Sequence, residues 1–134
     1  MSVTEAMKWW RLAAEQGSVD AQTNLGLVYL KGEDVAQNFL EAAKWWRLAA
    51  AQGDAEARKS LGVMYAQGQG LTQDFVLAHM WLNLSASQGN AEAAKFLDEI
   101  SKHMTAQQIT EAESIARNCK VSNYSHCDVG DRTF

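Results

Sequence analysis

Proline is absent from this 134-residue chain, cysteine occurs only twice, and long apolar runs are missing. Because proline removes a helical hydrogen bond and clashes with the preceding turn, its absence favours long unbroken helices. A membrane-spanning helix needs roughly 18 or more consecutive apolar residues. No such run occurs, so we expect no membrane span.

Positive charge is also scarce, with 12 Lys and Arg residues against 16 Asp and Glu residues and a formal net charge of -4. Proteins that bind nucleic acids in general carry a basic surface. The composition therefore argues against nucleic acid as the partner.

The first residues lack the charged segment and apolar core of a secretory signal peptide. The first expected helix begins within a few residues of Met1. We therefore expect a trimmed or mature form, for which the missing signal peptide does not argue against export.

A block of twelve residues is repeated along the chain. The block AMKWWRLAAEQG at 6–17 recurs 36 residues later as AAKWWRLAAAQG at 42–53, and a looser copy begins at Ala78. A fixed period of this size is typical of a solenoid of stacked helical hairpins. The sequence therefore predicts an all-α fold of three hairpin repeats, at about 2–37, 38–73 and 74–103.

Residues that begin and end helices recur with the same period. Side chains of Ser, Asp and Asn cap helix starts, and Gly suits the left-handed position after a helix end. The first N-cap series is Ser2, Asn38 and Asp74, the second is Ser18, Asp54 and Asn90, and the glycines are Gly17, Gly53 and Gly89. We expect first helices at about 3–15, 39–51 and 75–87, and second helices at about 19–30, 55–66 and 91–103.

A last helix is expected after the third repeat. Thr105 and Gln108 have the spacing of a capping box, in which each side chain bonds the other residue's backbone N–H. This capping helix, at about 105–120, would close the end of the stack and complete one domain over 1–120. Residues 121–134 lack periodicity, and we expect a loose tail there unless Cys127 holds it.

The second repeat resembles the Sel-one-like repeat family, which is related to the tetratricopeptide repeats. Its matching residues are Ala42, Trp45, Leu48, Ala49, Ala50, Gln52, Gly53, Ala57, Leu61, Gly62, Tyr65, Gly68 and Gly70. The first repeat matches similarly, except that Asp34 stands where the last Gly is expected. The resemblance implies a right-handed α/α superhelix that acts as an adaptor or scaffold, often in bacterial envelopes.

In such a solenoid the first helices are expected to line the concave surface. Trp9, Trp45 and Trp81 would be core, and the residues that follow them would form a ridge edged by cations, able to bind an acidic or amphipathic peptide. Trp and Arg are frequent binding anchors. The candidate contact residues are Lys8, Trp10, Arg11, Lys44, Trp46, Arg47, His79, Leu82 and Asn83. Aromatic rows at helical spacing are usually core, so the alternative is that both Trp series pack between helices.

Cys119 and Cys127 are separated by seven residues. This spacing resembles the cysteine-rich members of the family, in which such a pair cross-links a hairpin. A disulfide here would imply an oxidising compartment, so that the protein would be periplasmic or secreted. Two free thiols in a cytoplasmic protein are the alternative.

Metal, cofactor and catalytic motifs are missing. His103, Cys119, His126 and Cys127 match no compact zinc signature, so we expect no metal or cofactor. No Ser has Lys three residues on, as a penicillin-binding serine mechanism requires. We therefore expect the protein to be a scaffold rather than an enzyme, and to bind a protein or peptide on its concave face. A self-associating solenoid that forms homodimers and a cell-wall or penicillin-binding hydrolase are the alternatives.

Overall fold

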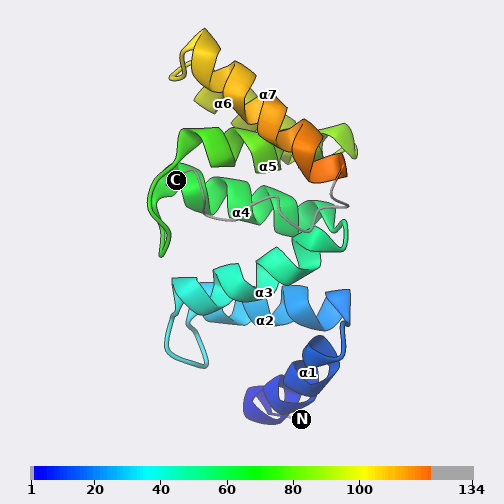
Figure 1. Ribbon diagram of the computed structural model, residues 1–134. Coiled ribbons are helices and arrows are strands. Elements are labelled where there is room, and N and C mark those ends of the chain that lie inside the picture. Colours follow the sequence, from blue (N-terminus) through cyan, green and yellow to red (C-terminus); the bar gives the residue numbers. More distant parts are fainter. Residues whose placement is uncertain (1, 122–134) are drawn as a thin grey trace.

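The computed structural model describes residues 2–121, and all regular structure among them is helical. The helices follow one another as a stack along one axis, with α1 at one end and α6 and α7 at the other (Figure 1). Their bounds are α1 Val3–Glu15, α2 Val19–Lys31, α3 Phe39–Ala51, α4 Ala55–Gln67, α5 Phe75–Ser87, α6 Ala91–Ser101 and α7 Ala106–Val121. The expected all-α solenoid of three hairpins and a last helix is confirmed. None of these helices is long and apolar enough to cross a membrane.

The helix boundaries lie where the repeated caps predict them. Asn38 and Asp74 accept hydrogen bonds from the backbone N–H three residues on, and so does Ser2 at the first helix. Gly53 adopts φ +100° between α3 and α4, a backbone conformation that disfavours any side chain. Local sequence thus specifies each hairpin before any packing between repeats is considered.

Neighbouring repeats approach closely at a glycine in the second helices α2 and α4. A Cβ on Gly26 of α2 would lie 2.3 Å from the indole nitrogen of Trp46 on α3. The same nitrogen donates a hydrogen bond of 3.3 Å to the carbonyl oxygen of Thr23. One repeat later, a Cβ on Gly62 would lie 2.6 Å from Leu82. Each glycine therefore makes the space into which the next repeat inserts a side chain.

The expected aromatic ridge is not formed, because Trp46 and Leu82 are buried against these glycines. Trp10 is only half-buried, since the described residues provide no preceding helix for it. The alternative, that the second series packs between repeats, is the correct one for α3 and α5.

The assignment of Trp9 to the core is wrong. Trp45 and Trp81 are buried, whereas Trp9 is 60% exposed. Trp45 packs in a cluster with Met7, Ala14 and other residues of the preceding repeat. Trp9 occupies the same repeat position but has no such neighbour among residues 2–121.

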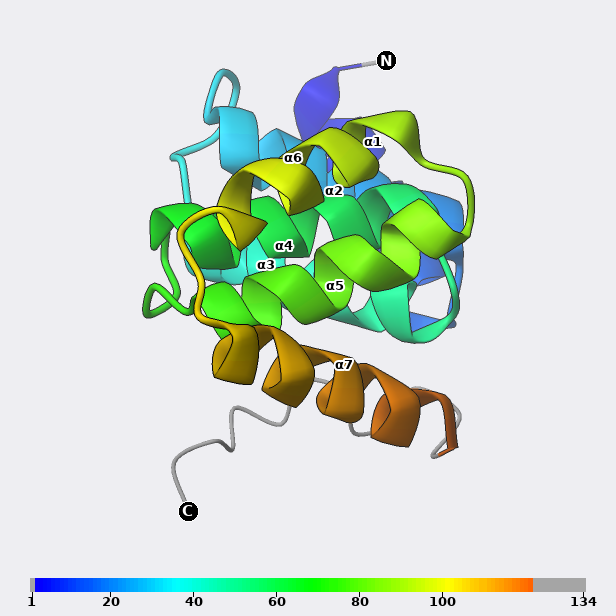
Figure 2. The ribbon, with the colours of Figure 1, turned by 90° about the horizontal axis from the view of Figure 1, so that it is seen from above.

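The last helix does not continue the stack of repeats. The Thr105 backbone N–H donates to Gln108 Oε1 at 2.9 Å, and the Gln108 N–H donates to Thr105 Oγ1 at 3.1 Å, so the predicted capping box is confirmed. Instead of stacking on α6 as the next first helix would, α7 packs along α5 (Figure 2). The helix therefore covers one side of the third repeat.

Candidate partner-binding face

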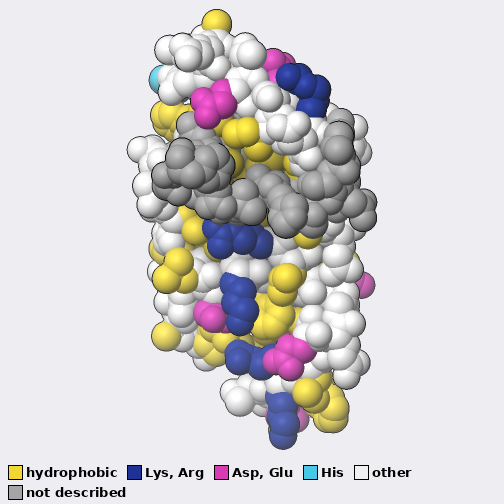
Figure 3. All heavy atoms as spheres, in the orientation of Figure 1, with side chains coloured by type: hydrophobic (Ala, Val, Ile, Leu, Met, Phe, Trp, Pro, Cys, Tyr) yellow, Lys and Arg dark blue, Asp and Glu magenta, His cyan; other side chains and the backbone are white. Residues whose placement is uncertain are grey.

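Leucines and cations alternate on one outward side of α1 and α3. Figure 3 shows Lys and Arg side chains in a column beside hydrophobic side chains on this face. Three of the leucines are unusually open, with Leu12 47%, Leu40 64% and Leu48 45% exposed. We name this surface the leucine–cation strip, formed by Lys8, Arg11, Leu12, Leu40, Lys44, Arg47 and Leu48.

The two arginines of the strip are positioned by tyrosines of the second helices. Arg11 donates a hydrogen bond to the Tyr29 hydroxyl, and Arg47 donates one of 2.9 Å to the Tyr65 hydroxyl. The 18-residue separation is the same in both pairs. Holding a guanidinium group in one orientation reduces the entropy lost when it binds an anionic group.

A lysine of the strip is also held in place. Lys44 Nζ lies 5.0 Å from the centre of the Trp45 ring, within the range of a cation–π contact. Lys8, one repeat earlier, is exposed. The cations predicted from the sequence therefore lie on the surface, even though the tryptophans predicted beside them do not form a ridge.

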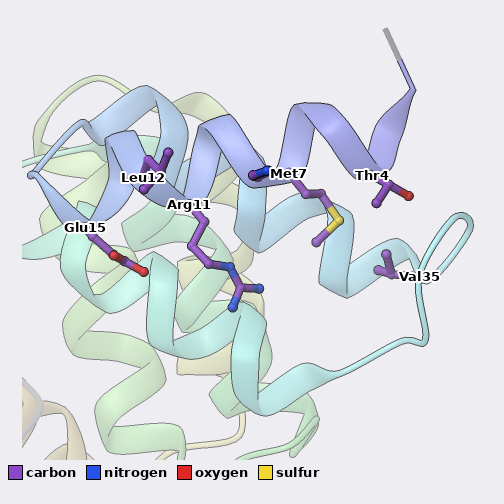
Figure 4. A pocket seen from close by; sticks show the side chains of 7 residues that line it. Thr4, Met7, Arg11, Leu12, Glu15 and Val35 are labelled. Atoms are coloured by element: carbon purple, nitrogen blue, oxygen red, sulfur yellow. The ribbon is translucent and has the colours of Figure 1, made fainter.

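A hollow of about 420 Å³ lies on α1 at one end of the strip. Figure 4 shows Thr4 and Met7 directed toward Val35 of the loop between α2 and α3, with Arg11 and Glu15 further along the helix. The hollow is open rather than enclosed, and its walls are mostly apolar. It can accept an apolar side chain of a partner next to charged groups.

The contact residues expected on α5 are wholly or partly buried. His79 and Leu82 are buried and Asn83 is half-buried. Burial lowers the pKa of His79, and the Glu113 carboxylate on α7 opposes that shift without cancelling it. Among residues 2–121, His79 Nδ1 has no hydrogen-bond partner. His79, expected as a contact residue on the surface, is therefore buried, because α7 packs against this helix.

A separate small cavity of about 210 Å³ lies on the side of the second helices. Lys59 in its wall contacts Glu56 at 3.0 Å and Glu92 at 3.2 Å. Burial alone lowers the pKa of Lys59, but the hydrogen bonds to both carboxylates outweigh burial, so its pKa is raised. Lys59 thus links α4 to α6, which is a structural role.

Only one cysteine of the predicted pair lies within the described residues. Cys119 is buried on α7, whereas Cys127 and His126 lie outside residues 2–121. The disulfide stays a prediction. Within the described range, no group of three or more His, Cys, Asp or Glu side chains is placed to hold a metal ion.

Comparison with known proteins agrees with this architecture. The family model described as the Sel1 repeat matches residues 3–18, 19–54 and 55–90. The chain belongs to the Sel1 repeat family. Sel1 repeat proteins generally act as protein-interaction scaffolds rather than as catalysts. No curated protein matches this chain.

Two solved structures are similar to this Sel1 repeat chain. The Sel1 repeat protein from Oxalobacter formigenes is 38% identical, with a TM-score of 0.69 over 73% of this chain and 74% of that one. The protein c5321, a protective antigen of uropathogenic Escherichia coli with an SLR fold, is 31% identical, with a TM-score of 0.83. The alignment with c5321 covers 96% of this chain but only 28% of that chain.

Proposed function

We propose that this protein is an interaction module that binds a protein or peptide through the leucine–cation strip. The observation that supports it is the row of exposed Leu12, Leu40 and Leu48 beside cations, two of which are held by tyrosine hydroxyls. Exposed apolar patches edged by polar groups are typical of interaction sites. The partner would cover the leucines and bring acidic groups to the cations.

The test is a pull-down from native extracts with the full chain and matched variants. Lys8→Glu, Lys44→Glu and Leu48→Ser change exposed residues of the strip, while Lys31→Glu and Leu27→Ser change exposed residues of α2. We expect the strip variants to lose the captured partner and the α2 variants to retain it. Equal recovery by both groups, with folding checked by circular dichroism, would overturn the proposed site.

We also propose that the protein works in the cell envelope, as a periplasmic or secreted protein. Its support is the Cys119–Cys127 spacing, which resembles cysteine-rich relatives, and the similarity to a protective antigen. Mass spectrometry of freshly isolated native protein, with and without reductant, tests this. A mass two hydrogens lower before reduction is expected, and two free thiols would count against the proposal.

Self-association is a second candidate, favoured by the exposed Trp9 at the end of the stack. Exposure of this large aromatic ring leaves apolar area that a second copy could cover. Sedimentation at several concentrations would show a dimer that Trp9→Ala weakens. A monomer at every concentration would exclude this candidate.

A further inference from the structure

The third repeat already carries a helix on the side that is open in the first two repeats. Helix α7 packs on α5, and the face that α5 presents includes Val76, Met80 and Leu84, all of them buried. The residues 36 positions earlier on α3 are Leu40, Lys44 and Leu48, all of them exposed. Among the described helices, none packs on the strip, which is therefore the equivalent on α1 and α3 of the surface that α7 covers on α5.

The contacting side of α7 is made of small residues at helical spacing. Ala112, Ala116 and Cys119 are at most 4% exposed, and Ile115 is half-buried beside them. Such residues let two helix backbones approach closely. Glu111 and Glu113 are exposed on the same helix. The face of α5 that corresponds to the strip thus packs against an apolar stripe of small residues on α7.

Charge distinguishes the occupied surface from the open one. On α5, Met80 and Asn83 stand where α3 has Lys44 and Arg47 and α1 has Lys8 and Arg11. Neutral residues avoid the cost of removing a cation from water beneath a packed helix. A partner on the first two repeats would instead bring carboxylates to the exposed Lys8 and Lys44.

We propose that the leucine–cation strip binds an amphipathic helix of the partner that has a small apolar stripe and acidic flanks. This helix would lie on α1 and α3 as α7 lies on α5. The inference rests on the proposed function and adds the conformation and charge of the bound segment. A helix fits because residues at i, i+3, i+4 and i+7 lie on one side, so one segment can meet the leucines with its stripe and the cations with its flanks.

The test uses fluorescently labelled synthetic peptides and the full-length protein. The first peptide has 18 residues, with Ala and Ile at i, i+3, i+4 and i+7 and Glu at flanking positions. Isolated helices shorter than about 12–15 residues are marginal in water, so a peptide only slightly longer can still gain helix when it binds. The second has the same composition in scrambled order, and the third has Lys in place of Glu. Anisotropy measures affinity, and circular dichroism measures the helix gained on binding.

We expect the first peptide to bind at least about tenfold more tightly than either control and to gain helicity when bound. Leu48→Ser and Lys44→Glu should each weaken it by about tenfold or more, whereas Leu27→Ser and Lys31→Glu should leave it unchanged. Equal affinity for the scrambled acidic peptide, or binding without added helix, overturns the helical mode.

Failure of this inference can be told apart from failure of the proposed function. If the pull-down depends on the strip but no helical peptide binds, the partner engages the strip in another conformation and only the inference here is overturned. If the peptide binds equally well to the strip variants, the assigned surface itself is wrong.

Discussion

Glycine at two positions decides how closely successive repeats stack. The indole of Trp46 lies where a Cβ on Gly26 would be, and Leu82 lies similarly against Gly62. A glycine within a helix costs about 1 kcal/mol relative to alanine. That cost is offset here by the burial of Trp46 and Leu82, which are at most 5% exposed.

Gly26→Ala tests this point at the scale of the residue. The added methyl group would lie 2.3–2.6 Å from three atoms of the Trp46 ring. Overpacking typically costs about 1–3 kcal/mol, and the better helix propensity of alanine offsets about 1 kcal/mol of that cost, so we expect the free energy of unfolding to fall by up to about 2 kcal/mol. Urea denaturation measures it.

The matched control is the double variant Gly26→Ala/Trp46→Ala. If the clash is the cause, the loss in the double variant should be clearly smaller than the sum of the two single losses. Strict additivity would contradict the proposed contact between Gly26 and Trp46.

At the scale of the element, the contact of α7 with α5 contains a buried titratable group. His79 is 5% exposed, its Nδ1 has no hydrogen-bond partner in the part of the chain that the structure describes, and burial lowers its pKa. Glu113 on α7 acts in the opposite direction without reversing the shift. The neutral imidazole is therefore the form that this interface accommodates.

We predict that folding stability falls as the pH decreases below about 6.5, the pKa of an unfolded histidine. Because the pKa of His79 is lower in the folded state, the unfolded chain binds more protons in this range, and acidification favours unfolding. His79→Leu should reduce this pH dependence in urea denaturation between about pH 5 and 8. His103→Gln, which changes an exposed histidine, should retain it. An unchanged profile for His79→Leu would contradict the prediction.

At the scale of the whole molecule, the apolar core is unevenly distributed. One cluster joins residues of α3 to α7, whereas a smaller cluster joins α1 and α2 to Trp45. In repeat proteins, stability is approximately a sum of repeat terms and nearest-neighbour terms. The first repeat has fewer neighbours and carries the exposed Trp9.

Native-state hydrogen exchange should therefore show a gradient along the stack. We expect amides of α1 to exchange at lower opening free energies than those of α4 and α5, because local opening follows the amount of buried contact. Mass spectrometry of peptic fragments would measure this gradient. Equal protection of α1 and α5 would mean that the molecule unfolds as one cooperative unit.

Several elements of the candidate site were predictable from sequence, and several were not. Lys8, Arg11, Lys44 and Arg47 were predicted to be surface cations because their positions repeat with the tryptophans. Leu12 and Leu48 were missed as contact residues, although they recur one helical turn after the lysines. Their exposure depends on whether another helix covers that side, which the repeat pattern does not specify.

The sequence by itself determined the period, the caps and the glycine turns, because each depends on hydrogen bonds and backbone conformations within a few residues. Tertiary structure decided which side of each helix is covered. Trp46 is buried because Gly26 makes room for it, and the α5 face is buried because α7 packs there rather than on α6. Exposure is a property of contacts between helices, so the open strip on α1 and α3 became visible only in the folded molecule.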